Sequence, residues 1–249
     1  MAILSLTVRQ NNIIWTGFLF LLGLFKEQKE KRISMPSVLA YFKKSWTFVL
    51  GFVLFAVYIY INRGVALGME AKEFAEISIT FNSIYYFFFT NFLFFFPEHI
   101  NNLGRVAGYI KKNRRKIIVF LIFLVFFLLT FKNDHVWNQT DYLLRNRPLN
   151  FFNANISGKL IYFAAISYTS LSLYFFHFRE KICFLLYPIL FLTVVTFNLV
   201  EPRYYMVFYA FFILLKKSPS LILYMSTFLF WILFDLWMMT GTINFAFYP

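Results

Sequence analysis

The stretch IIVFLIFLVFFLLTF, residues 117–131, most limits what this chain can fold into. It contains no charged residue, and Thr130 is its only polar side chain. The backbone of so apolar a run must satisfy its own hydrogen bonds, which a helix does within one segment. Only 14% of the 249 residues are charged, whereas a soluble domain carries about a quarter. The chain is therefore predicted to be an all-α, polytopic membrane protein.

Seven further apolar segments accompany this run along the chain. A helix that crosses a bilayer needs roughly 17–25 predominantly apolar residues. The eight predicted spans are 13–25, 46–62, 79–97, 117–131, 160–178, 182–200, 204–215 and 221–239. Residues 1–249 are thus expected to form a single transmembrane domain of eight helices.

Basic residues cluster at every second connection between these spans. Four blocks, at 26–44, 98–116, 179–181 and 216–217, hold 16 of the 24 Lys and Arg residues. Because positive loops stay in the cytoplasm, all four blocks are assigned to the cytoplasmic side. The non-cytoplasmic connections are then 1–12, 63–78, 132–157, 200–204 and 240–249. The net charge of +13 is therefore explained by membrane orientation, and no nucleic acid is expected as a partner.

The segment NLVEPRYYMVF interrupts the apolar sequence at the non-cytoplasmic rim. Pro202 suits the first turn of a new helix, and Tyr204 and Tyr205 suit the aromatic belt of a membrane interface. Arginine binds phosphate through a bidentate fork. We interpret Arg203 as a phosphate contact that Glu201 orients; the alternative is that the whole group only anchors the chain at the interface.

The longest non-cytoplasmic connection, 132–157, carries His135, Trp137, Asp141 and Arg145. An aromatic ring beside amide and carboxylate groups is typical of sugar sites, where it stacks on the sugar while the polar groups bind hydroxyls. Asp141 is a weak candidate for a general base, since a base must reach the acceptor hydroxyl directly or through one water. A solvated loop with Trp137 in the interface is the alternative.

Other polar residues give weaker signals. His99 and His177 are interpreted as cytoplasmic interface residues. The sequons that begin at Asn138 and Asn155 are possible glycan acceptors on the other side. No set of His, Cys and carboxylate residues has the spacing of a metal site, and no Gly-rich phosphate loop is present. Neither a metal nor a cofactor is therefore expected.

Several short motifs occur in a recognisable order. They are VRQNNIIW (8–15), GVALG (64–68), FFFP (94–97), His135 followed by Asp141, and LVEPRYY (199–205). This order resembles the C-terminal half of the terminal α-1,2-glucosyltransferase family of dolichol-linked oligosaccharide assembly. Three features depart from that family's pattern. Met69 follows Gly68 where the family has Asp, the histidine expected a few residues later is absent, and Asp141 is not followed by Asn-Arg-His-Tyr.

The resemblance implies a GT-C-like fold and a hexosyltransferase in the N-glycan precursor pathway. The donor would be a dolichyl- or polyprenyl-phosphate hexose, in that family glucose, and the acceptor a lipid-linked oligosaccharide. The membrane would be the endoplasmic reticulum in a eukaryote or the inner membrane in a bacterium. The resemblance also adds Arg9 as a second phosphate contact. The candidate substrate-binding residues are Arg9, Asn11, His135, Trp137, Asp141, Arg145, Glu201, Arg203 and Tyr204.

The resemblance also places the expected catalytic acid in a loop before Met1, so residues 1–249 are expected to correspond to the family without its N-terminal catalytic half. Two alternatives to catalysis therefore stay open. One is a non-catalytic relative that binds lipid phosphate or supports a partner. The other is a transporter, although the spans show no inverted repeat of the kind that transporters usually have.

Overall fold

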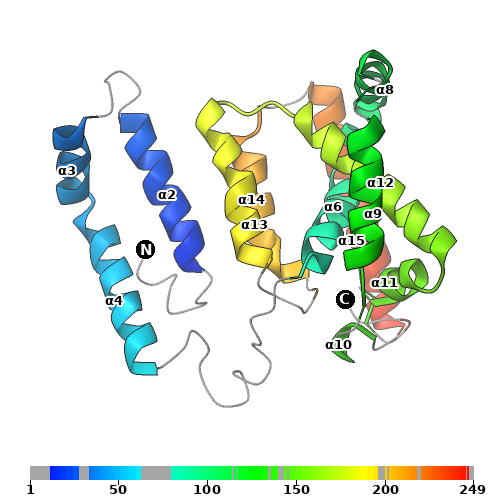
Figure 1. Cartoon of the computed structure of the whole chain (residues 1–249), viewed down its shortest axis with the longest axis horizontal. Helices are drawn as coiled ribbons and strands as arrows, with labels where there is room; N and C mark the ends of the chain where they lie inside the picture. The colour runs from blue at the N-terminus through cyan, green and yellow to red at the C-terminus, as the bar shows by residue number, and fades with distance from the viewer. Residues whose placement is uncertain are drawn as a thin grey trace.

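The structure is a computed structural model of the whole chain, drawn in Figure 1. It describes residues 12–27, 34–62, 80–113, 115, 117–133, 136–139, 143–144, 146–195, 200, 202–217, 220–244 and 246. Over these residues the chain is helical. The only β-type pairing among them is an isolated antiparallel bridge between Phe178 and Lys216. The predicted all-α class is confirmed.

The helices follow one another with short connections. In chain order they are α2 (Asn12–Glu27), α3 (Met35–Lys44), α4 (Trp46–Asn62), α6 (Asn82–Phe94), α7 (Phe96–Asn101), α8 (Leu103–Lys112), α9 (Ile117–Thr130), α10 (Val136–Gln139), α11 (Asn146–Asn153), α12 (Ile156–Tyr174), the 3₁₀ helix η2 (Lys181–Leu185), α13 (Leu186–Val194), the 3₁₀ helix η3 (Pro202–Tyr204), α14 (Met206–Leu215) and α15 (Leu221–Ile243).

Each predicted span coincides with a helix, or with a pair of helices, over its described residues. By length and hydropathy, however, α15 is the one described helix that could cross a bilayer by itself. A second span results if α3 and α4, which meet at a bend of 78°, are taken together. Apolar helices such as α9 and α14 are shorter. The number of eight spans therefore stays a prediction.

The third predicted span, 79–97, is broken between α6 and α7 at Phe95. Proline has no N–H to donate and cannot continue the hydrogen bonding of a helix interior. Pro97 instead lies in the first turn of α7, where the missing donor costs nothing. The break turns α7 into a separate short helix whose Glu98 and His99 are both buried.

Interlocking aromatic rings form the core. Buried rings of α6 and α14 meet edge to face, as between Phe87 and Phe208, whose centroids are 4.8 Å apart. The Phe152 and Tyr162 rings stack at 4.8 Å and join α11 to α12. Such pairs contribute about 0.5–1.5 kcal/mol beyond the burial of their area. The core fixes α6, α12 and α14 around one another and thereby sets the positions of their ends.

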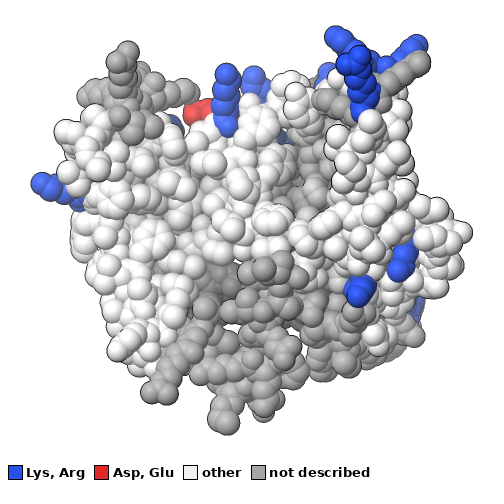
Figure 2. All heavy atoms as spheres, viewed as in Figure 1, with Lys and Arg blue, Asp and Glu red and all other residues white. Residues whose placement is uncertain are grey.

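The two ends of the helices differ in charge. Figure 1 places α8 and α10 at opposite ends of the molecule. Figure 2 shows Lys and Arg side chains gathered along the edge where α8 lies, with few elsewhere on this face. The end that carries α8 is the one assigned to the cytoplasm, and the end that carries α10 is the predicted non-cytoplasmic rim.

Candidate functional site

Most of the predicted substrate-binding residues lie outside the described residues: Arg9, Asn11, His135, Asp141, Arg145 and Glu201. Two more, Trp137 and Arg203, are described through their backbone, on α10 and η3. Tyr204 is described in full and is half-buried against the aromatic core. The site is therefore built here from the residues that hold these two short helices in place.

One hydrogen bond joins the two predicted parts of the site. The backbone N–H of Val200 donates to Oδ1 of Asn138 over 3.2 Å, and Asn138 is completely buried. Asn138 belongs to α10, next to Trp137, while Val200 lies two residues before the start of η3, the helix that contains Arg203. Segments that are 62 residues apart in sequence are thus fixed side by side at the predicted non-cytoplasmic end.

Amide side chains hold α10 against its neighbours. Nδ2 of Asn133 donates to the Asn138 carbonyl (3.2 Å) and to Oδ1 of Asn150 on α11 (2.7 Å). Nε2 of Gln139 donates to the Asn133 carbonyl over 2.9 Å. Because buried polar groups are costly when unpaired, this network gives the four-residue helix α10 a defined position. Sequence reasoning missed this role of Asn133 and Asn150, since nothing local marks which amides pair.

Tyr205 is a correction to the sequence prediction. Instead of lying in an interfacial belt, its ring is completely buried, and its hydroxyl donates to the Ser83 carbonyl over 2.6 Å. Its backbone N–H also closes η3 by donating to the Pro202 carbonyl over 3.0 Å. Tyr205 therefore anchors the turn that carries Arg203 to the first turn of α6.

The buried Asn138 also bears on the predicted glycan acceptors. Its amide is enclosed and hydrogen-bonded, so it leaves no room for a sugar in the folded protein. Asn155 is exposed, and its Oδ1 accepts the Gly158 N–H over 2.7 Å as the N-cap of α12. The Asn138 sequon is therefore structural.

We expect Asn138→Ala to destabilise the protein by about 1–3 kcal/mol, because it leaves the buried Val200 N–H without an acceptor. Any activity of the site should fall further than stability alone explains, since α10 and η3 lose their link. Lys132→Ala is the matched control, because the Lys132 side chain is exposed at the same end. Denaturant titration and activity of both variants check this; equal effects would contradict the positioning role.

Comparison with known proteins decides the family. The sequence pattern of the DIE2/ALG10 family matches residues 27–214. The chain belongs to the DIE2/ALG10 family. No curated protein and no solved structure matches the chain. The DIE2/ALG10 family consists of glycosyltransferases of dolichol-linked oligosaccharide assembly, so the predicted family is confirmed, while the correspondence to its C-terminal half stays a prediction.

The DIE2/ALG10 match covers both segments that meet at the predicted non-cytoplasmic end. The loop 132–157 and the LVEPRYY motif lie inside 27–214, whereas Arg9 and Asn11 lie before it. Among the described residues, no group of His, Cys, Asp and Glu could hold a metal ion. What the described geometry offers is a short helix bearing Trp137 beside a turn bearing Arg203.

A second polar cluster lies at the opposite end and was missed. His99 was predicted at the interface, but it is completely buried. Its Nδ1 lies 2.8 Å from Oγ of Ser172 on α12, and its Nε2 lies 3.1 Å from Oδ1 of Asn91 on α6. Because the amide oxygen can only accept, Nε2 carries the proton and Nδ1 accepts from the serine. His99 thus joins three helices as a neutral ring.

The pKa of His99 is lowered from 6.5 to about 3, mainly by burial; the nearby Lys216 ammonium also lowers it, and the hydrogen bond to Asn91 opposes the shift. Between these two pH values the unfolded chain binds a proton that the folded protein does not. Stability is therefore complete above about pH 6.5 and is lost as the pH falls, by roughly 1.4 kcal/mol per pH unit.

Between about pH 6.5 and pH 5, the free energy of unfolding of His99→Gln should fall by about 2 kcal/mol less than that of the wild type. The reason is that the variant has no imidazole at this position to take up a proton on unfolding. Unfolding in detergent at several pH values measures the difference. His177→Gln is the control, since His177 is exposed. A slope that is the same in wild type and His99→Gln would contradict the neutral buried ring.

Proposed function

We propose that this glycosyltransferase moves a hexose, glucose in α-1,2 linkage, from a dolichyl- or polyprenyl-phosphate donor to a lipid-linked oligosaccharide. The reaction belongs to the N-glycan precursor pathway and takes place at the non-cytoplasmic end of the helices. In a eukaryotic cell this is the lumenal face of the endoplasmic reticulum membrane. Neither a metal nor an organic cofactor takes part in this proposal.

The chemistry asks for two neighbouring groups of residues. The acceptor hydroxyl oxygen forms a bond to the anomeric carbon, and the bond from that carbon to the phosphate oxygen breaks. The lipid phosphate leaves with the bonding electron pair, and the hydroxyl proton passes to a base. A cation must bind the phosphate, and aromatic and polar groups must hold the sugars.

Arg203 is proposed as the phosphate contact, with Glu201 to orient it and Tyr204 beside it. Trp137, His135, Asp141 and Arg145 of the loop are proposed to hold the sugars, and Asp141 is the acid of this loop that we would test as the base. Arg9 and Asn11 would contribute to the same rim.

The observation that carries the proposal is the hydrogen bond between Asn138 and the Val200 N–H. It holds α10, in the loop proposed to bind the sugars, against the segment that leads into η3, the turn proposed to bind the phosphate. The two segments that we propose to carry these groups therefore meet at one end of the molecule, although they are far apart in sequence. Family membership supplies the reaction class, and this contact supports its location.

The test is reconstitution of the whole chain in lipid vesicles with labelled dolichyl-phosphate glucose and a lipid-linked oligosaccharide acceptor. Label appearing in the oligosaccharide supports the proposal. Retention of donor without transfer would favour the non-catalytic relative. Movement of label across the bilayer without transfer would favour the transporter.

A further inference from the structure

A polar cavity of about 390 Å³ lies at the predicted cytoplasmic end, away from the proposed site. Its wall comes from three places: the end of α7 with the start of α8, the residues after α12, and Lys217 and Ser220 with the first turn of α15. The residues with charge or hydrogen-bonding capacity on this wall are Glu98, Asn101, Asn102, Arg105, His177, Lys217 and Ser220. Its size falls within the range of small-molecule sites, about 300–1,000 Å³.

The charges on this wall leave a net positive cavity. The Glu98 carboxylate is paired with the buried ammonium of Lys216, so it is already neutralised. Arg105 and Lys217 remain, both exposed. Arg105 keeps most of its donors available, since its one described side-chain contact is a long hydrogen bond of 3.5 Å to Oδ1 of Asn102. A guanidinium and an ammonium on one cavity favour an anion, and phosphate in particular.

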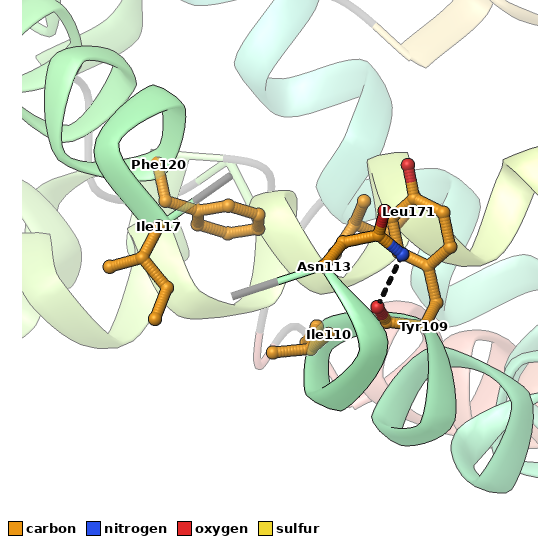
Figure 3. Close-up of a pocket in the computed structure, with 6 residues that line it drawn as sticks. All are labelled: Tyr109, Ile110, Asn113, Ile117, Phe120 and Leu171. Atoms are coloured by element: carbon orange, nitrogen blue, oxygen red, sulfur yellow. Dashed lines mark hydrogen bonds between the residues drawn. The ribbon is translucent and has the colours of Figure 1, made fainter. Parts of the chain in front are cut away.

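A neighbouring cavity shows the contrast. It has about 220 Å³ and lies between α8, α9 and α12, lined by Tyr109, Ile110, Asn113, Ile117, Phe120 and Leu171 (Figure 3). Its one amide, that of Asn113, donates back to the Tyr109 carbonyl of its own helix over 2.9 Å. The wall of this smaller cavity is apolar and carries no charged residue. Of the two cavities, only the polar one is therefore expected to prefer anions.

The surroundings of the polar cavity point to a lipid as the source of the phosphate. Leu223 and Phe176 form an apolar part of its wall. Next to it, Leu221 and Ile222 at the start of α15 are 75% and 81% exposed. A molecule whose phosphate lies between Arg105 and Lys217 can therefore extend an apolar chain along α15. Basic pockets between helices on the cytoplasmic side are a known way to bind anionic headgroups.

We propose that this cavity, formed by α7, α8 and α15, binds the headgroup phosphate of an anionic phospholipid of the cytoplasmic leaflet. Arg105 and Lys217 bind the phosphate, and the apolar start of α15 lies along the acyl chains. The site is at the opposite end from the proposed transferase site and does not depend on that activity.

The test uses the whole chain in detergent, with binding of dioctanoyl phosphatidic acid, dioctanoyl phosphatidylcholine and glycerol 3-phosphate measured by calorimetry. Arg105→Gln with Lys217→Gln should weaken phosphatidic acid binding by about 25-fold, because each cation near a lipid surface contributes roughly a fivefold factor. Lys111→Gln with Lys112→Gln is the matched control, since it removes two exposed cations of α8 outside the cavity. The control should change affinity by about twofold or less.

Equal losses in the two double variants would overturn the proposal, because the attraction would then be a general effect of charge. Binding of glycerol 3-phosphate as tight as that of phosphatidic acid would overturn the lipid in favour of a soluble phosphate ester. Equal affinity for phosphatidylcholine would overturn the preference for an anionic headgroup.

Discussion

Glu98→Gln is expected to destabilise the protein by roughly 3–5 kcal/mol, the usual cost of breaking one partner of a buried ion pair. The Glu98 carboxylate and the Lys216 ammonium form an ion pair in which both side chains are more than nine-tenths buried. The ammonium also lies over the Phe95 ring, 4.6 Å from its centroid, and within 6 Å of the Phe176 and Phe212 rings. Without Glu98, an unpaired cation would be enclosed by aromatic carbon.

The pH dependence of this variant distinguishes a lost charge partner from lost packing. Burial lowers the pKa of Lys216, and the Coulombic and hydrogen-bonding contributions of Glu98 oppose that shift. In Glu98→Gln the pKa of Lys216 should fall further, while the unfolded chain keeps the ordinary value of 10.5. Between those values the unfolded state binds more protons, so the stability of the variant should rise with pH. Denaturant titration in detergent at neutral and alkaline pH measures this.

A double variant provides the second check. Glu98→Leu with Lys216→Met replaces the pair by apolar side chains, and such replacements are often neutral or stabilising. It should therefore be more stable than Glu98→Gln. Lys217→Met, next in sequence but exposed, should change stability by about 0.5 kcal/mol or less. A double variant as unstable as the single one would show that the pair contributes through shape and not through charge.

The helices themselves could be predicted from sequence because their signal is local. Long apolar runs bounded by basic or polar segments located all of the described apolar helices, and 46–62 coincides with the bounds of α4. The break within 79–97 was missed because Pro97 is tolerated inside the first turn of a helix, so its presence alone does not say where a helix ends. Helix α12 begins at Ile156, before the predicted start of the span at residue 160, because Asn155 caps its N-terminus.

The polar clusters could not be predicted in the same way. Glu98 and Lys216 are 118 residues apart, and His99 and Ser172 are 73 apart. The predicted topology does place all four near the cytoplasmic ends of spans, which makes such pairs possible without choosing between them. The helix break at Phe95 determines which pairs form, because it turns Glu98 and His99 inward. His99 was interpreted as an interface residue, whereas it is packed between helices.

In the candidate site, too, local features could be predicted from the sequence and long-range contacts could not. The motif order led to the family, and the alternating sides predicted that the loop 132–157 and LVEPRYY share one end. Which residues hold them together was not visible, since Asn138 looked like a glycan acceptor and Tyr205 like an interfacial ring. Both prove to be structural, and their partners, the Val200 N–H and the Ser83 carbonyl, are backbone groups that no side-chain pattern reveals.

Arg203→Ala is expected to lower the rate of sugar transfer by about 10²–10³-fold, the usual cost of removing one preorganised group that stabilises developing charge. In the proposed reaction, negative charge grows on the lipid phosphate as its bond to the sugar breaks. η3, closed by the hydrogen bond from Tyr205 to Pro202, fixes the backbone position of Arg203 at the end where α10 lies. Arg203→Lys should fall between the wild type and Arg203→Ala, since lysine keeps the charge but not the bidentate fork.

Steady-state kinetics in the vesicle assay separates this role from a structural one. A phosphate contact predicts a higher KM for the lipid-phosphate donor, a lower kcat and an unchanged KM for the oligosaccharide. Lys132→Ala is the matched control, because Lys132 is an exposed cation at the same end and should leave all three constants within about twofold. A folded Arg203→Ala protein with unchanged donor affinity and rate would remove Arg203 from the site, and the phosphate contact would then have to come from another cation of the same rim.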